Sequence, residues 1–350
     1  ALSSGANNTV MGCGAGEAMT SGSCNIIIGK DTMGNDTVTG VNNIAIGCMA
    51  GRNVTGGNRN ILLGQYAGGN VTTGCQNIIF GNSAGGSGTL TGTHNMLMGH
   101  CAGKKTTSGS NIILGQLAGQ EVTTASNNIW IGKNAGRNVT GCQNVFLGRD
   151  AGCNGTTVNN SVFIGDYAGK GQSTNGQNVA IGAEAMCCGG TGYHNVTLGS
   201  SSGKCITSGY KNIAIGFCAM SEGNVAGNKN VAMGVQAGAK LTNGGGNVFL
   251  GSYAGCCTTV KDGNTFIGCA AGQCNTGGQN TFVGTAAGCA NGGTCFSIAI
   301  GCRAGYLQTA GDRNIVIGCK ANVPVTTGSD QIALVGGGGD NFINSFIGCC

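Results

Sequence analysis

The chain has 350 residues, of which 72 are glycine, one is proline, 40% are hydrophobic and 8% are charged. Glycine at this level without proline or a Gly-X-Y period excludes a collagen triple helix, and few charges with many apolar residues exclude a disordered chain. The net charge of +5 is spread without a basic run, which argues against a nucleic-acid partner, and no apolar run reaches the roughly 20 residues that membrane insertion needs.

The first predicted strand precedes Gly12, and its motif, Asn-apolar-x-apolar-Gly, then recurs along the chain. Successive motif glycines are 16, 17 or 18 residues apart, and they fall at Gly12, Gly29, Gly47, Gly64, Gly81, Gly99, Gly115, Gly132, Gly148, Gly165, Gly182, Gly199, Gly216, Gly234, Gly251, Gly268, Gly284, Gly301 and Gly318. A unit this short cannot bury its own apolar face, so it must stack on its neighbours.

The repeat therefore predicts an all-β fold, a parallel β-solenoid (β-roll) of about twenty 17-residue coils over residues 1–319. Each coil is expected to carry one strand at the motif and a second at its Val-Thr-Thr stretch. Beyond Cys319 the frame loosens at Pro324 and at the glycine run 336–339. Residues 320–350 are therefore predicted to form an irregular cap or a transition segment.

Stacked coils place equivalent residues in columns, which are interpreted here as strand faces. The positions one and three places before the motif glycine, such as Ile44 and Ile46, are expected to form the core. The position between them would then point outward, where large apolar groups need a partner surface. Local packing against a loop of the same chain is one interpretation of this outer column. The other, preferred here, is a self-association face for a homotrimer, formed by Leu62, Ile79, Leu97, Ile113, Trp130, Phe146, Phe163, Phe249, Phe266 and Phe282.

Three polar or small columns accompany the strands. The asparagine that opens most motifs, for example Asn43 and Asn60, predicts a ladder of stacked amides with a structural role. An alanine three places past the glycine, followed by a second glycine, suits a tight inward corner. Threonine recurs eight places past the glycine, as at Thr55 and Thr72, and predicts a β-branched ladder.

With these columns, the repeat N-I-A-I-G-x-x-A-G over residues 8–318 resembles the head repeats of YadA-like trimeric autotransporter adhesins. It is also similar to the N-x-x-I-G-x-x-A-G arrays of tail-fibre-like proteins from phages and large viruses. The resemblance implies a parallel β-roll, three chains around one axis, and display on a cell or virion surface for attachment. The period near 17 residues and the 21 cysteines depart from the adhesin heads.

Three pairs of cysteines lie 17 residues apart, which is one coil: Cys188 with Cys205, Cys257 with Cys274, and Cys302 with Cys319. Adjacent coils lie about 4.8 Å apart, within reach of a disulfide, so these pairs are predicted to form vertical disulfides in an extracellular protein. Reduced, half-buried thiols are the alternative. Five candidate glycosylation sequons share one corner of the coil, at Asn35, Asn53, Asn70, Asn138 and Asn154. The alternative role for these asparagines is turn formation.

No catalytic, cofactor-binding or metal-binding constellation is predicted. There is no C-x-x-C pair, and the histidines, such as His94 and His100, do not join paired cysteines in a four-ligand set. We therefore expect a structural or adhesive extracellular fibre that displays an attachment surface for a receptor or glycan. Two alternatives remain open from the sequence, a subunit joined end to end in an extracellular filament and an ice-binding β-solenoid.

Overall fold

A computed structural model describes residues 4–173, 176–290 and 292–335. Within these ranges the chain contains twenty three-residue strands and no helix. The described residues divide into two compact units, one within residues 1–176 and the other within residues 177–350. The predicted all-β class and the parallel β-solenoid are confirmed.

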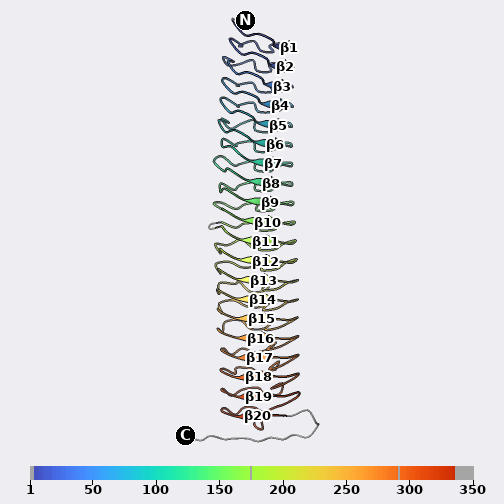
Figure 1. The fold of residues 1–350 in the computed structure, drawn as a ribbon, viewed down its shortest axis with the longest axis vertical. Helices are drawn as coiled ribbons and strands as arrows, with labels where there is room; N and C mark the ends of the chain where they lie inside the picture. Colours follow the sequence, from blue (N-terminus) through green and yellow to red (C-terminus); the bar gives the residue numbers. More distant parts are fainter. Residues whose placement is uncertain (1–3, 174–175, 291, 336–350) are drawn as a thin grey trace. The chain divides into compact units, whose positions relative to one another are not determined.

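In the first unit, ten strands stack in chain order, each parallel to the one before it and in register (Figure 1). The bounds are β1 Thr9–Met11, β2 Ile26–Ile28, β3 Ile44–Ile46, β4 Ile61–Leu63, β5 Ile78–Phe80, β6 Met96–Met98, β7 Ile112–Leu114, β8 Ile129–Ile131, β9 Val145–Leu147 and β10 Val162–Ile164. The register puts each motif position on the same position of the next coil, such as Phe146 opposite Phe163.

The second unit repeats this arrangement with β11 Val179–Ile181, β12 Val196–Leu198, β13 Ile213–Ile215, β14 Val231–Met233, β15 Val248–Leu250, β16 Thr265–Ile267, β17 Thr281–Val283, β18 Ile298–Ile300, β19 Ile315–Ile317 and β20 Ile332–Leu334. The strand β20 pairs with β19 beyond the predicted boundary at residue 319, so regular stacking extends one coil further than expected. The glycine run 336–339 and the rest of the predicted cap lie outside the described residues.

The motif glycine ends each strand because no side chain fits there. At Gly47, φ is 134°, and an added Cβ would lie 2.6 Å from the carbonyl oxygen of Gly64 on the next coil. The chain then turns through a non-glycine residue with positive φ two places later, such as Tyr66 at 55°, which costs about 1 kcal/mol. The backbone N–H of Tyr66 donates to the carbonyl of Cys48 on the preceding coil, and this bond stabilises the turn.

The middle residue of each strand points into the solenoid, which reverses the predicted orientation. The ten residues assigned to an outward self-association face are all completely buried: Leu62, Ile79, Leu97, Ile113, Trp130, Phe146, Phe163, Phe249, Phe266 and Phe282. The reason is the asparagine ladder. Asn43 and Asn60 are also buried, and the residue two places after an inward residue faces inward as well. The first and third strand residues, predicted as core, face outward instead.

Two positions of each coil share the core and are matched in size: the middle residue of the strand and the residue four places past the motif glycine. Beside large middle residues the coil carries glycine, and a Cβ at Gly136 would lie 2.5 Å from the Trp130 ring. Where the middle residue is alanine, methionine can take the glycine's place. Met186 follows Ala180, and both side chains are completely buried. Met220 and Ala214 form the same combination, so the interior stays filled at these coils.

The predicted second strand at the Val-Thr-Thr stretch does not form in the described residues. This side of the coil shows only isolated parallel bridges, between Met19 and Val38, between Val71 and Leu90, and between Ile206 and Val225. Its length varies from coil to coil, because the motif spacing changes between 16 and 18 residues. The motif side, by contrast, keeps its register from coil to coil.

Candidate interaction surface

The outward residues of the strands form two adjacent apolar columns, here called the strand face: the first and third residue of every strand. In the first unit its most exposed large side chains, 36% to 62% accessible, are Met11, Ile26, Ile46, Ile78, Phe80, Met98, Ile112, Ile129 and Ile131. In the second unit they are Val196, Leu198, Ile213, Met233, Ile267, Ile300, Ile317 and Leu334. Contiguous apolar surface on this scale marks an interaction site.

The strand face is backed by the buried asparagine ladder, which fixes the strands in register. The backbone N–H and the side-chain Nδ2 of Asn77 both donate to Oδ1 of Asn60, at 3.0 and 3.1 Å, and Nδ2 also donates to the carbonyl of Gly92. Where serine replaces asparagine, the ladder persists, because Ser297 accepts the N–H of Asn314 through its hydroxyl. The predicted ladder is confirmed, and it holds the face flat and regular.

Polar side chains flank the strand face on both sides. On the side after the motif glycine, the Arg149 guanidinium pairs with Asp166 of the next coil, with Nε 2.8 Å from Oδ1. On the side before the asparagine, Arg313 pairs with Asp330 at 2.6 Å. The hydrogen bonds from these arginines lower the pKa of each aspartate. An apolar strip between polar margins is the usual anatomy of a protein–protein interface.

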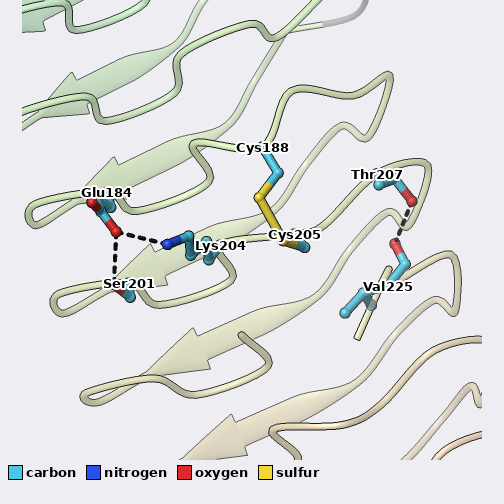
Figure 2. The surroundings of a disulfide bond; sticks show 7 residues. All are labelled: Glu184, Cys188, Ser201, Lys204, Cys205, Thr207 and Val225. Atoms are coloured by element: carbon cyan, nitrogen blue, oxygen red, sulfur yellow. Dashed lines mark hydrogen bonds and ion pairs between the residues drawn. A yellow bond between two sulfur atoms is a disulfide. The ribbon is translucent and has the colours of Figure 1, made fainter. Parts of the chain in front are cut away.

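One of the three predicted disulfides is formed in the structure. Cys188 and Cys205 are bonded across adjacent coils with their Cα atoms 5.0 Å apart, next to a cluster in which Lys204 and Ser201 both bind Glu184 (Figure 2). The remaining predicted pairs, Cys257 with Cys274 and Cys302 with Cys319, are present as separate thiols.

The corner around Cys257 holds several further thiols. The sulfur of Cys256 lies 3.6 Å from that of Cys257, and the sulfur of Cys289 donates to the side-chain carbonyl of Gln273 at 3.4 Å. Burial is the main cause that raises the pKa of Cys256 to about 12, and the hydrogen bond with Cys257 is the second cause. Burial also raises the pKa of Cys289. These thiols are therefore protonated and weakly nucleophilic at neutral pH.

The five sequon asparagines share one corner but differ in their contacts. Nδ2 of Asn53 donates to Oδ1 of Asn70, and Nδ2 of Asn70 donates to the carbonyl of Ser87. Nδ2 of Asn138 donates likewise to Oδ1 of Asn154. Asn35 is exposed at the same corner. The corner thus contains short amide ladders, and glycosylation at any of the five stays a prediction.

The threonine column stabilises stacking through its hydroxyls. Oγ1 of Thr55 donates to the carbonyl of Thr72 at 3.0 Å, and Thr107 and Thr242 make the equivalent bonds to the next coil. The donors of these hydroxyls are therefore committed within the chain. This arrangement does not favour the ice-binding alternative, which needs a flat array of outward threonines.

A second ladder of side-chain acceptors was not anticipated from the sequence. It runs two places before the buried asparagine, where Oδ1 of Asn58 accepts the N–H of Val41 and Oδ1 of Asp262 accepts the N–H of Gly245. Stacked Tyr193 and Tyr210, with ring centroids 5.1 Å apart, occupy this column in the second unit. Elsewhere the column holds asparagine, aspartate, serine, threonine, cysteine, valine and glycine, so no single residue type reveals it.

Neither a metal site nor a helical membrane span is present in the described part of the chain. No group of three or more histidine, cysteine, aspartate or glutamate side chains is placed there to hold a metal ion. Nor does any helix there have the length and apolar character that crossing a membrane requires. The strand face is thus the most extensive candidate site in the described ranges.

Comparison with known proteins adds no relative to this description: no protein-family model matches the chain, and no curated protein matches it.

Proposed function

We propose that the chain is a structural fibre protein that self-associates along its strand face into a homotrimer and presents an attachment surface outside a cell or on a virion. The observation that carries the proposal is the strand face itself. Ten coils that each expose about a third of two large side chains amount to on the order of 1,000 Å² of apolar surface per unit, against about 800 Å² per partner in a standard interface.

The regular spacing of the strand face favours a second copy of the chain as its partner. Successive coils carry apolar residues at the same two strand positions and in the same register. Ile112 and Leu114, for example, pair with Ile129 and Ile131 of the next coil. A partner that stays complementary over many coils needs rows with this spacing, and another copy has them. A globular partner would match only a few coils.

The difference between the two apolar columns favours three chains over two. The first column is mostly β-branched, with isoleucine or valine in most strands, whereas the third position also accepts leucine, methionine and Phe80. Unlike columns suit a head-to-tail contact, in which the first column of one chain packs on the third column of the next. Such contacts close into a ring, and three chains are the smallest ring that they form.

The disulfide between Cys188 and Cys205 supports an oxidising, extracellular setting.

The test is the mass of the native assembly. We expect the wild-type protein to be a trimer by native mass spectrometry and light scattering. The double variant Ile112→Asp/Ile131→Asp places two charges on the strand face and is expected to be a monomer with an unchanged β-sheet circular dichroism spectrum. Thr123→Asp, an exposed control away from that face, is expected to remain trimeric. A monomeric wild type, or an assembled double variant, contradicts the proposal.

A further inference from the structure

The second unit has a hollow of about 220 Å³ beside the strand face, on the side before the asparagine, lined by Lys261, Asp262, Gly278, Gln279, Cys295 and Phe296. It lies at a coil where the second ladder of side-chain acceptors, two places before the buried asparagine, has no side chain. Gly278 occupies the ladder position between Asp262 and Cys295, which carry side chains on the coils to either side. A Cβ at Gly278 would lie 3.1 Å from the backbone oxygen of Asp262 and 3.5 Å from Cβ of Lys261. The missing side chain therefore makes the hollow.

The wall residue Phe296 has no evident role in stabilising the fold. Its side chain is 57% exposed, and its φ of 56° matches the positive φ of the equivalent residues on other coils, such as Lys211 and Gln279. Its backbone is held there because its N–H donates to the carbonyl of Gly278 at 3.1 Å. Equivalent positions on other coils carry polar residues, such as Lys211, Gln279 and Arg313. An exposed phenyl ring at a position where other coils carry polar side chains points to a binding role.

The residues that line the hollow limit the class of ligand that it can bind. Below the 300–1,000 Å³ range of drug-sized sites, a hollow of this volume suits a ligand of about one ring. The ring of Phe296 offers an apolar surface, and Lys261, Asp262 and Gln279 offer donors and acceptors on exposed side chains. Charges of both signs are present, so a phosphate or another simple anion is not favoured.

We propose that this hollow binds a single pyranose ring of a glycan. The C–H face of the sugar packs on Phe296, and its hydroxyls hydrogen-bond with the Asp262 carboxylate and the Gln279 amide. Oδ1 of Asp262 already accepts the N–H of Gly245 at 2.7 Å, which orients the carboxylate and leaves Oδ2 for the ligand. This inference gives the attachment surface of the proposed function a chemical class, but it does not depend on trimer formation.

The experiment is saturation-transfer NMR with the methyl glycosides of glucose, galactose, mannose and N-acetylglucosamine. We expect at least one of them to bind the intact protein with a Kd on the order of 1 mM, as for a small ligand in an open site. Phe296→Asn should weaken that binding at least tenfold while raising thermal stability, because asparagine tolerates positive φ. Opposite effects on binding and stability exclude misfolding as the cause.

Two further variants locate the site. Gly278→Ala reduces the hollow and should weaken binding, whereas Gly56→Ala, on a coil of the first unit where the nearest atoms to an added Cβ are 3.9 Å away, should not. The double variant Ile112→Asp/Ile131→Asp should still bind, which separates this inference from the trimer proposal. Absence of saturation transfer from all four glycosides, or unchanged binding by Phe296→Asn, overturns it.

Discussion

At the scale of single residues, the interior depends on pairs of positions that share one space. Phe146 is stacked between Trp130 and Phe163, with ring centroids 6.0 and 4.9 Å away, and its ring occupies the space in which a side chain at Gly152 would lie. Size matching of this kind is characteristic of a close-packed interior. It also explains why glycine is frequent in a position with φ near 57°, where it makes room for aromatic rings.

We expect Phe146→Ala to lower the free energy of unfolding by about 3–5 kcal/mol, because it leaves a cavity in the aromatic stack. Equilibrium denaturation monitored by the fluorescence of Trp130, the only tryptophan in the chain, measures the loss. The control Tyr66→Ala removes an exposed ring away from the strand face and should cost less than about 1 kcal/mol. Equal losses in the two variants would contradict the assignment of Phe146 to the core.

At the scale of the element, each coil is held to the next by side-chain ladders as much as by the strand. Three strand residues give few backbone bonds, whereas Asn95 alone adds bonds from its N–H and its Nδ2 to Oδ1 of Asn77, both at 2.9 Å. Because these groups are buried, an unsatisfied member costs about 1–3 kcal/mol. The ladder therefore sets the register that the short strands could not set by themselves.

We expect Asn77→Ala to destabilise the protein by about 3 kcal/mol, since it leaves buried groups of Asn95 without an acceptor. Asn77→Ser should cost clearly less, because serine already continues the ladder at Ser161 and Ser297. Denaturation gives both values, and hydrogen exchange should show faster exchange at the Asn95 amide in the alanine variant only. Indistinguishable serine and alanine variants would be inconsistent with this ladder role.

The repeat, the parallel stacking and the asparagine ladder could all be predicted from the sequence, but the inward direction of the strands could not be settled by alternation alone. Two opposite faces were both apolar, as Ile129 and Trp130 show. The structure resolves the ambiguity because a buried Asn128 fixes the phase. The pairing of Met186 with Ala180 was a signal of the interior in the sequence. The hollow near Phe296 depends on one missing side chain among neighbouring coils, which spacing does not reveal.

At the scale of the whole molecule, the few charges predict a weak dependence of stability on pH. The pKa values of Glu121, Asp166 and Asp330 are lowered by hydrogen bonds from Lys105, Arg149 and Arg313 on adjacent coils. These carboxylates contribute to stability when the pH is above their ordinary pKa values, 4.5 for Glu and 3.8 for Asp. The contribution is lost as the pH falls through their lowered pKa values in the folded protein. Surface pairs of this kind contribute little.

Thermal unfolding at low salt should therefore give a nearly constant Tm from neutral pH down to about pH 4.5, with a small decrease below it. The alkaline loss of stability should begin near 9.0, the ordinary pKa of a thiol, because burial raises the pKa of Cys256 and of Cys289 in the folded state. The raised pKa of Lys204, which follows from its bond to Glu184, adds a loss above its ordinary value of 10.5. Asp166→Asn should flatten part of the acid decrease. A steep loss of stability near pH 6 would show that another titrating group holds the fold.

The turns described above also bear on how the protein folds. The described residues include forty non-glycine residues with positive φ, about two for each coil, and each costs about 1 kcal/mol. A solitary coil has no neighbour to receive its ladder bonds, so it begins with an uncompensated penalty. Folding should accordingly have an expensive nucleus of several coils, followed by rapid zipping of further coils onto the growing end, as in a one-dimensional lattice with strong coupling between adjacent sites.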